Sequence, residues 1–556
     1  MNNKIMKRVA AAILALLLVV ALAACGGSES SSGGGSAGAS AGGSAAAGGG
    51  SGGEEGGGSV GTTGPLVIGV SGSLASLDIN QLGGILDYKI AAVSLEGLVG
   101  IDNSGQIIPT LAESWTDEDA TVWTFKLRPD VTFWDGTPLT ADDVIYSIQR
   151  SMDPEQSPGV VYYFPDYVTG VEKAADDEVK ITLDGPHANF ILAVSNTGGL
   201  FVQSKAFLES AESVGSAKDL LMGTGPFVPA EFEAGSHVTY VANENWWGGR
   251  PSVNSLRFDF FADENTRLLA FTQGDIDFAF DVPVDQAEQW EGVDGATVSF
   301  LDNRAYYGLT FDVTVAPFDD EHVRKAVAYA IDKDSIVAGG VLKGHGTPAT
   351  AIQAPEQFAA AMSVDEAAAK LADVTHYDFD IDKAKEELAQ SGSPDGFEVE
   401  LSYPDAYQAV GKASLIIASS LEQIGITLNV KEIPLDQWLG EVGNGEQGVA
   451  WMIYEPTTPE PGEIAGWLLD AEGPGYNPAN WTDEEVTTLR NEMMAAPDFA
   501  SEIEPTLKAN SIAQEQAIYA PVWWGQSAIA AQQYTHVKDF NSYSLLSSNW
   551  PELFAA

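Results

Sequence analysis

The sequence predicts a mixed α/β fold, and two observations support this prediction. Apolar runs and period-two patterns typical of strands alternate with helix-like segments in both halves of the chain. Residues 397–403, 413–424 and 426–433 are expected to form a strand, a helix and a strand, which is a βαβ unit with parallel pairing. With 556 residues, of which 45% are hydrophobic, the chain has enough apolar material for a packed core.

Local patterns predict the other elements in chain order. Residues 66–70 form a short apolar run and residues 121–128 alternate with period two, so both predict strands. Thr140 and Asp143 form a capping box before a helix that carries Ile148 on its apolar face. Further strands are expected at 238–242 and 256–261, and further helices from Asp319 to about Val337 and from Asp382 to Gln390.

Residues 1–24 are typical of a secretory signal peptide, because basic residues precede an apolar run that ends at Ala24. This run is shorter than the roughly 20 residues of a membrane-spanning helix. Cys25 is the single cysteine of the chain, and its surroundings, Leu22-Ala-Ala-Cys-Gly26, resemble a bacterial lipobox. We therefore expect lipidation at Cys25, which anchors the protein to the extracytoplasmic face of the cell membrane. The alternative is a signal peptide without lipidation.

Residues 25–64 are expected to be a lipidated cysteine followed by a flexible tether, since nearly all of them are Gly, Ser or Ala. The folded body then begins near Pro65. The formal net charge of −52 repels polyanions and argues against a nucleic-acid partner. A single cysteine also excludes an intramolecular disulfide and a cysteine-built zinc site.

A series of motifs follows in the body. They are Leu111–Trp115, Trp123–Arg128, Phe133–Val144, Gly223–Phe227 with Asn245–Gly249, Asn265–Arg267 with Gly274–Asp277, and Pro317–Asp320 with Val323–Asp332. Together these motifs closely resemble the family 5 extracellular solute-binding proteins, the peptide, nickel and opine receptors of ABC importers. The resemblance covers essentially everything from Pro65 to the C-terminus.

The resemblance implies a periplasmic-binding-protein-like α/β fold of cluster C type, in which two lobes are joined by hinge crossovers. Lobe I is expected at 65–304, with a small extra sub-lobe at about 110–220. Lobe II is expected at 305–519, and residues 520–556 return to lobe I. The function implied is capture of a small solute, in the first place an oligopeptide, in the inter-lobe cleft and its delivery to the ABC permease subunits.

The two crossovers supply the first candidate ligand-binding residues. Arg304, Tyr306 and Tyr307 lie on one crossover, and Trp523 and Trp524 lie on the other. Flat aromatic walls suit a peptide because they add contact area without specifying its sequence. The alternative is that these rings belong to the core. Arg304 is expected to pair with a ligand carboxylate or, equally, with a neighbouring Asp.

Oligopeptide-binding members of the family imply four further aromatic positions, Tyr162, Tyr163, Phe280 and Trp451. The Asp that pairs with the peptide ammonium in those members falls at Tyr454 in this sequence. A buried ammonium needs an anion. Glu455, next to Tyr454, and Glu460 are therefore candidates for that role, unless the ligand has no free amine.

Other functions remain open alternatives. The same fold is compatible with a nickel chelate, an opine or an oligosaccharide as ligand, and with a surface receptor that senses peptides. His345 lies in a loop that the family places near the cleft, and it is a candidate for ligand contact. An enzyme is not expected, because the Gly-x-Ser-x-Gly, His-Glu-x-x-His and P-loop motifs are absent from the sequence. No cofactor is expected.

Overall fold

The computed structural model describes residues 64–82, 84–102, 105–164, 167–187, 189–405, 407–444, 448–469, 477–538, 540–541, 543–546 and 550–554. The predicted signal peptide, Cys25 and nearly all of the tether lie outside these residues. Within the described part, no helix combines the length and the apolar character that crossing a bilayer requires.

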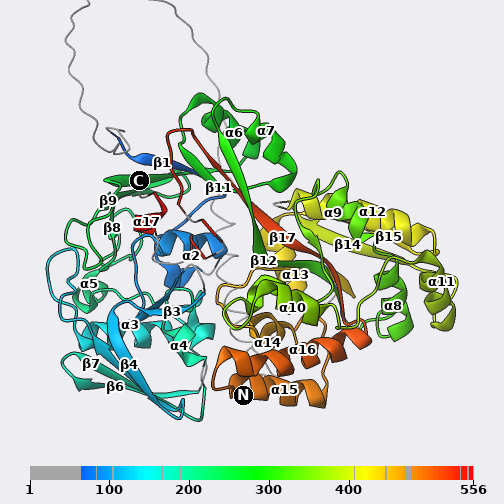
Figure 1. Ribbon diagram of the computed structural model, residues 1–556, viewed down its shortest axis with the longest axis horizontal. Coiled ribbons are helices and arrows are strands. Elements are labelled where there is room, and N and C mark those ends of the chain that lie inside the picture. Colours follow the sequence, from blue (N-terminus) through cyan, green and yellow to red (C-terminus); the bar gives the residue numbers. More distant parts are fainter. Residues whose placement is uncertain are drawn as a thin grey trace, which may run out of the picture. The chain divides into compact units, whose positions relative to one another are not determined.

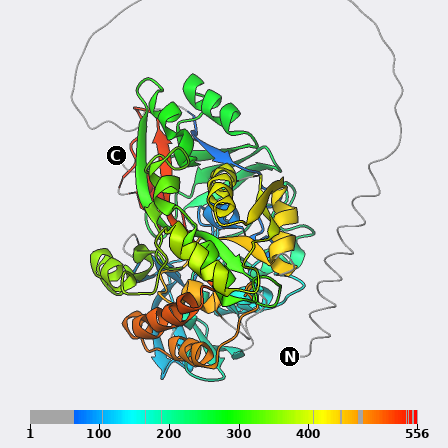
Figure 2. The ribbon, with the colours of Figure 1, turned by 90° about the vertical axis from the view of Figure 1, so that its right-hand side faces the viewer.

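One nine-stranded sheet runs through the body. Its two longest strands, β12 (Thr297–Phe311) and β17 (Tyr519–Ala531), pair antiparallel with each other. Figure 1 shows them as the green and red arrows side by side, and they run together again in Figure 2. From β12 the sheet continues to β16 (Val449–Tyr454). On the other side, β17 is followed in order by β11 (Phe278–Val282), β1 (Leu66–Ser71), β10 (Ser255–Phe261), β9 (His237–Ala242) and β8 (Phe227–Glu233).

The hydrophobic cores divide the body into two groups. Buried residues from 66–290 and 528–554 form three cores. Buried residues from 306–524 form two others. We call residues 66–302 with 526–554 lobe I, and residues 306–524 lobe II. Strands β12 and β17 pass from one lobe to the other, so the lobes share one hydrogen-bonded ladder.

Lobe I contains most of the sheet and a separate four-stranded antiparallel sheet. The second sheet has the order β4 (Ala112–Glu118), β5 (Val122–Leu127), β7 (Glu178–Leu183), β6 (Val168–Ala175). A further pair joins β2 (Val99–Ile101) and β3 (Ile107–Pro109). The helices are α2 (Ile85–Ala91), α3 (Ala141–Ser151), α4 (Phe190–Ala193), α5 (Lys205–Ser210), α6 (Glu264–Gln273), α7 (Ala287–Glu291) and α17 (Trp550–Leu553).

Lobe II packs helices around β16 and a parallel pair, β14 (Glu398–Pro404) and β15 (Thr427–Ile433). A short strand, β13 (Thr347–Pro348), lies beside β17. The helices are α8 (Glu321–Tyr329), α9 (Lys333–Ala338), α10 (Val364–Leu371), α11 (Ile381–Gln390), α12 (Gln408–Glu422), α13 (Leu435–Asn444), α14 (Glu463–Leu468), α15 (Glu484–Met494) and α16 (Phe499–Glu515).

Most predicted elements are confirmed, and one is wrong in detail. The βαβ unit is present as β14, α12 and β15, with parallel pairing. The helix predicted from Asp319 to Val337 is two helices, α8 and α9. Asp332 explains the break, because its side chain accepts the N–H of Ser335 at 3.0 Å and so caps a new helix.

Candidate functional site

The strands that join the lobes carry a stack of aromatic rings. Tyr307 of β12 and Trp523 of β17 are paired in register, with ring centroids 4.6 Å apart and planes 13° from parallel. Trp451 of β16 is tilted against Trp523 at 5.6 Å. Trp451 is fully buried and donates its indole N–H to the hydroxyl of Ser414 at 2.8 Å. Of the three rings, only Tyr307 is half-buried rather than buried.

The neighbouring aromatic residues lie on the opposite face of the ladder. Tyr306 and Trp524 are also paired in register, and side chains alternate between the two faces of a strand. Tyr306 is fully buried in a lobe II core. Trp524 belongs to the same core and donates its indole N–H to the carbonyl of Ala351 at 3.0 Å. A role for Tyr306 and Trp524 in ligand binding stays a prediction.

Lobe I contributes two of the predicted aromatic positions to the junction with lobe II. Phe280 of β11 is buried, and the ammonium of Lys89 lies 5.7 Å from the centre of its ring. The hydroxyl of Tyr163 shares a hydrogen bond with the hydroxyl of Thr457 in lobe II at 2.9 Å. Tyr163 therefore contacts the second lobe directly. The side chain of Tyr162 lies outside the described residues.

A group of charged side chains bridges the lobes beside this aromatic wall. The ammonium of Lys89, on α2 in lobe I, is 2.7 Å from a carboxylate oxygen of Asp281 and 3.9 Å from one of Glu455 in lobe II. Burial alone lowers the pKa of Lys89, but Asp281 and Glu455 outweigh it and hold that pKa above its ordinary value. The charges of the same carboxylates also act on Tyr307 and Tyr407. After burial, Glu455 and Asp281 contribute to the raised pKa of both tyrosines.

A fully buried arginine holds the backbone at Asp281. The Arg267 guanidinium donates to the carbonyl of Phe280 at 2.8 Å and to the carbonyl of Asp281 at 3.0 Å. It is also paired with Glu264 at 2.8 Å and lies over the ring of Trp290. Asp281 has a φ of 51°, in the left-handed region that residues other than glycine rarely adopt. Such strain persists only where the surroundings impose it, as they do at many ligand sites.

The segment that follows β16 is held by Glu463, a buried acid at the start of α14. Its carboxylate accepts the hydroxyl of Tyr454 at 3.1 Å and the backbone N–H groups of Thr457 and Thr458 at 3.0 and 2.9 Å. Burial raises the pKa of Glu463. Tyr454 therefore holds the segment that carries Glu455 against Glu463.

Arg304 is buried between the two lobes. Its guanidinium donates to the carbonyl of Thr458 and lies 3.5 Å from the side-chain oxygen of Gln357. It also stacks 4.3 Å from the ring of Tyr543, which belongs to lobe I. These partners are carbonyl oxygens and an aromatic ring, not the neighbouring Asp considered above. Binding of a ligand carboxylate by Arg304 stays a prediction.

The second predicted ammonium partner, Glu460, is engaged with lobe I. It accepts the side-chain N–H of Asn189 at 2.6 Å. Burial, and then the charge of Glu463, raise the pKa of Glu460 to about 8. Burial likewise raises the pKa of its neighbour Glu502. Glu460 thus holds its proton near neutral pH, whereas Glu455 stands beside the Lys89–Asp281 pair, which makes Glu455 the better placed candidate.

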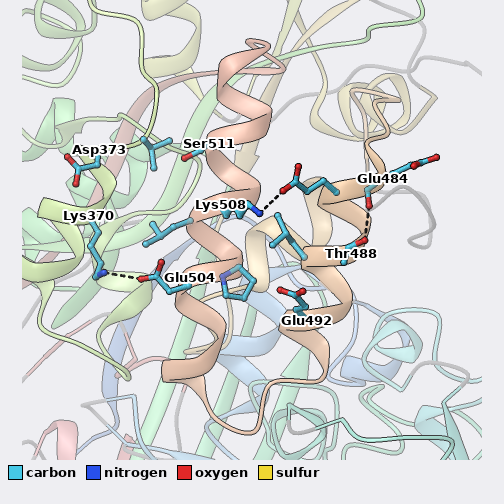
Figure 3. Close-up of a pocket in the computed structure, with 13 residues that line it drawn as sticks. Lys370, Asp373, Glu484, Thr488, Glu492, Glu504, Lys508 and Ser511 are labelled. Atoms are coloured by element: carbon cyan, nitrogen blue, oxygen red, sulfur yellow. Dashed lines mark hydrogen bonds and ion pairs between the residues drawn. The ribbon is translucent and has the colours of Figure 1, made fainter.

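A separate groove of about 910 Å³ lies on lobe II, between α10, α15 and α16 (Figure 3). Ion pairs join its walls, with Lys370 3.1 Å from Glu504 and Lys508 2.5 Å from Glu485. None of the candidate residues lines it. The groove is lined by Lys370, Asp373, Val374, Glu484, Glu485, Thr488, Leu489, Glu492, Glu504, Pro505, Leu507, Lys508 and Ser511.

The histidine singled out from the sequence stacks on an aromatic ring. His345 lies 3.9 Å from Phe300, with planes 10° from parallel. Among the residues that the structure describes, no group of three or more His, Cys, Asp or Glu side chains is arranged to hold a metal ion. Ligand contact by His345 stays a prediction.

Sequence reasoning missed Lys89, Asp281, Arg267 and Tyr407. Two of them had a readable signal. Lys89 interrupts the apolar residues of α2 between the buried Tyr88 and Ile90, and Asp281 interrupts the apolar strand β11. A charge inside an apolar run is costly to bury unless it is paired or functional. Arg267 lies in one of the family motifs, but nothing in that motif indicated which backbone groups it contacts.

Three comparisons with known proteins agree with one another. The family model "Bacterial extracellular solute-binding proteins, family 5 Middle" matches residues 106–475. The glutathione-binding protein GsiB of Pectobacterium atrosepticum is 27% identical over 461 residues, covering 82% of this chain and 84% of that protein. GsiB is thus a relative along most of its length.

Two solved structures share the fold. The binding protein AgaA of A. tumefaciens R10, in complex with agropinic acid, has a TM-score of 0.75 at 24% identity and covers 88% of this chain and 98% of its own. The ABC transporter-associated periplasmic binding protein DppA of Helicobacter pylori, in complex with the peptide STSA, has a TM-score of 0.75 at 22% identity and covers 87% and 97%. These matches confirm the predicted periplasmic-binding-protein-like fold.

Proposed function

We propose, from the premise that this chain belongs to the family 5 bacterial extracellular solute-binding proteins, that it captures an oligopeptide between its lobes and delivers it to an ABC permease. The family is one of transport solute-binding proteins and not of enzymes, as the sequence predicted. The oligopeptide as ligand is part of this proposal. The relatives bind different solutes, namely glutathione for GsiB, agropinic acid for AgaA and the peptide STSA for DppA.

The observation that carries this proposal is the junction of the two lobes. Lys89 and Asp281 of lobe I meet Glu455 of lobe II, and Tyr163 of lobe I meets Thr457 of lobe II. The ring of Tyr307, on a strand that joins the lobes, is half-buried and stacks on Trp523, and the charges of Glu455 and Asp281 act on it. Aromatic surface with a few convergent polar groups is typical of a small-molecule site, and lobe closure is a common way to enclose a ligand.

Anchoring by lipid is part of the proposal. Residues 1–24 direct export, Cys25 is lipidated, and residues 26–64 tether a body that starts near Pro65 on the extracytoplasmic face of the membrane. The resemblance of residues 22–26 to a lipobox supports this assignment. We also propose that the three ranges expected above, 65–304, 305–519 and 520–556, correspond to lobe I, lobe II and the returning part of lobe I, with the lobe II core reaching to Trp524 in β17. The separate four-stranded antiparallel sheet, whose strands lie between Ala112 and Leu183, supports a sub-lobe at about 110–220.

A non-peptide ligand, such as an opine, a nickel chelate or an oligosaccharide, is the second candidate, because solved proteins that share this fold bind agropinic acid in one case and Ni(L-His) in another. A peptide-sensing surface receptor would use the same site. Transport and sensing differ in whether a radiolabelled solute enters cells, so uptake by a strain that lacks the protein, with and without the restored gene, separates them.

Native mass spectrometry tests the ligand class. The processed protein is extracted in detergent without refolding, since a ligand bound tightly to the folded state stabilises it and stays bound through purification. We expect extra masses that match short peptides. The Tyr307→Ala variant should lose them, whereas Tyr403→Ala, another half-buried tyrosine of lobe II, should keep them. A single non-peptide mass would assign the site to the second candidate instead.

A further inference from the structure

Glu460 lies where lobe II meets lobe I. Its backbone is fixed between Pro459 and Pro461, and the side chain of Gln357 donates to its carbonyl. Its carboxyl group reaches lobe I, where it accepts a side-chain N–H of Asn189 at 2.6 Å. Asn189 is the residue that precedes α4, so a helix of lobe I holds it in place. The hydrogen bond between Asn189 and Glu460 therefore forms only when the lobes are together.

Two buried acids of lobe II interact with Glu460, and we call the three residues the acid cluster. Glu463 lies at the start of α14, and the fully buried Glu502 lies on α16. One carboxyl oxygen of Glu502 accepts the N–H of Gly462 at 3.3 Å, whereas the other is buried and has no hydrogen-bond partner among the residues that the structure describes. A buried acceptor without a donor favours a proton on a neighbouring carboxyl group.

The charges around the acid cluster leave one negative charge in excess. Two cations act on it, Arg490 of α15 on Glu460 and Arg304 on Glu463. Three carboxylates against these two guanidinium groups give a net charge of −1, and a buried charge without a partner is costly. Asp498, an exposed acid, adds further negative charge. One proton on Glu460 removes the excess.

Lobe I faces Glu460 with side chains that carry no charge at neutral pH. They are Asn189 and Tyr167, and the charge of Glu460 contributes, after burial, to the raised pKa of Tyr167. His187 stacks on the far side of this contact, 3.9 Å from the ring of Tyr167, and its ring nitrogen is 3.0 Å from Asp184. Closure of the lobes thus replaces water around Glu460 with an amide and a phenol, which favours the protonated carboxyl group.

We propose that the lobes take up one proton at Glu460 when they close over the solute. This inference rests on the proposed function and adds a proton to the binding reaction, in which open protein, solute and proton combine to the closed complex. When the lobes separate, water reaches the carboxyl group and the proton returns to the solvent. Because the two binding events are linked, the affinity for the solute rises as the pH falls.

The pKa of Glu460 sets the pH range of this effect. Burial and the charge of Glu463 raise that pKa to about 8 in the structure described here. The gain in affinity is therefore complete below the ordinary pKa of a glutamate, and it is lost as the pH rises towards 8.

The test compares the wild type with Glu460→Gln, which removes the proton site and keeps an oxygen for Asn189. The full processed protein, stripped of bound solute by partial unfolding and refolded, is dialysed against an equimolar pool of tri- to pentapeptides at about pH 5.5 and about pH 7.5. One fully linked proton changes the affinity about tenfold per pH unit. We expect the wild type to bind the pool at least about tenfold more tightly at the lower pH, and Glu460→Gln to bind it about equally at both.

Asp285→Asn is the matched control. Asp285 is also an acid that bridges the lobes, since it pairs with Lys412 of lobe II, but it lies outside the acid cluster. This variant should keep the pH dependence of the wild type. A loss in Asp285→Asn as large as that in Glu460→Gln would overturn the proposal, because any acid between the lobes would then have the effect.

Calorimetry on the unaltered protein counts the protons directly. Binding of the same pool at about pH 6.5, where the peptide amino groups keep their own protons, is measured in two buffers of different ionisation enthalpy. We expect uptake of about one proton per protein molecule. No uptake, or an equal pH dependence in the wild type and Glu460→Gln, would overturn the inference and leave a peptide-binding protein. Binding of the pool at neither pH would overturn the proposed function, and this inference with it.

Discussion

Replacing Glu460 with Gln should change the pH dependence of stability. Burial and the charge of Glu463 raise the pKa of Glu460 from 4.5 to about 8. The folded protein therefore keeps this proton between about pH 4.5 and 8, whereas the unfolded chain releases it. Stability is fully present below about pH 4.5, and it is lost as the pH rises towards 8.

The size of the effect follows from the displacement of the pKa. A pKa displaced by one unit corresponds to a free energy of about 1.4 kcal/mol, so the full displacement corresponds to about 4–5 kcal/mol. We expect a change in the free energy of unfolding of only about 2 kcal/mol. Glu460 interacts with the neighbouring acids Glu463 and Glu502, so the effect does not belong to Glu460 alone, and its side chain keeps some exposure. Glu460→Gln removes the titration and keeps an oxygen that accepts from Asn189.

Urea unfolding of the full chain at pH 5 and pH 8 measures this difference. The wild-type protein should lose about 2 kcal/mol more than Glu460→Gln between the two pH values. Glu485→Gln is the control, because Glu485 is an exposed acid paired with Lys508 and should leave the wild-type pH dependence in place. Equal losses of stability in Glu460→Gln and the wild type would show that Glu460 does not hold a proton in the folded protein at pH 5 to 8.

Three further predictions concern other parts of the chain. Arg267→Met should destabilise the protein by about 3–5 kcal/mol in urea unfolding, since it leaves Glu264 and two buried carbonyls without their partner; a loss below about 1 kcal/mol would contradict this. Tyr163→Phe removes the hydrogen bond to Thr457 between the lobes, so peptide affinity measured by calorimetry should fall about fivefold; an unchanged affinity would show that this contact does not stabilise the closed state. Cys25→Ser should move the protein from the membrane fraction to the soluble fraction of the producing cells, and retention in the membrane would contradict lipid anchoring.

The fold was accessible from sequence wherever a local pattern determines an element. The parallel pair β14–β15 follows from the strand, helix and strand pattern between residues 397 and 433. The capping box at Thr140 marks the start of α3. The break between α8 and α9 was missed because the apolar spacing of four in Val323, Val327 and Ile331 runs up to Asp332, which acts as a cap only once the chain turns there.

The candidate site was accessible only in part, because it is assembled from distant segments. Tyr307 and Trp523 could be named from the aromatic crossovers, but their stacking depends on the register of two strands more than 200 residues apart. Lys89, Asp281 and Glu455 come from three segments, and no local pattern indicates that they meet. Trp451 and Tyr306 illustrate the opposite limit, since an aromatic residue near a site has the same sequence signal whether it faces a ligand or the core.

The ladder between β12 and β17 has a mechanical consequence. Its register shifts between Asp302 and Tyr306 and again between Tyr307 and Gly308, and Pro521 lacks an N–H to donate there. Elsewhere the two strands are regularly paired, so they resist twisting and sliding. We expect bending to be concentrated in these few residues, which then act as a hinge. The motion of the lobes would be described by one bending angle. A transporter that docks on both lobes would then distinguish the open from the closed protein by this one angle.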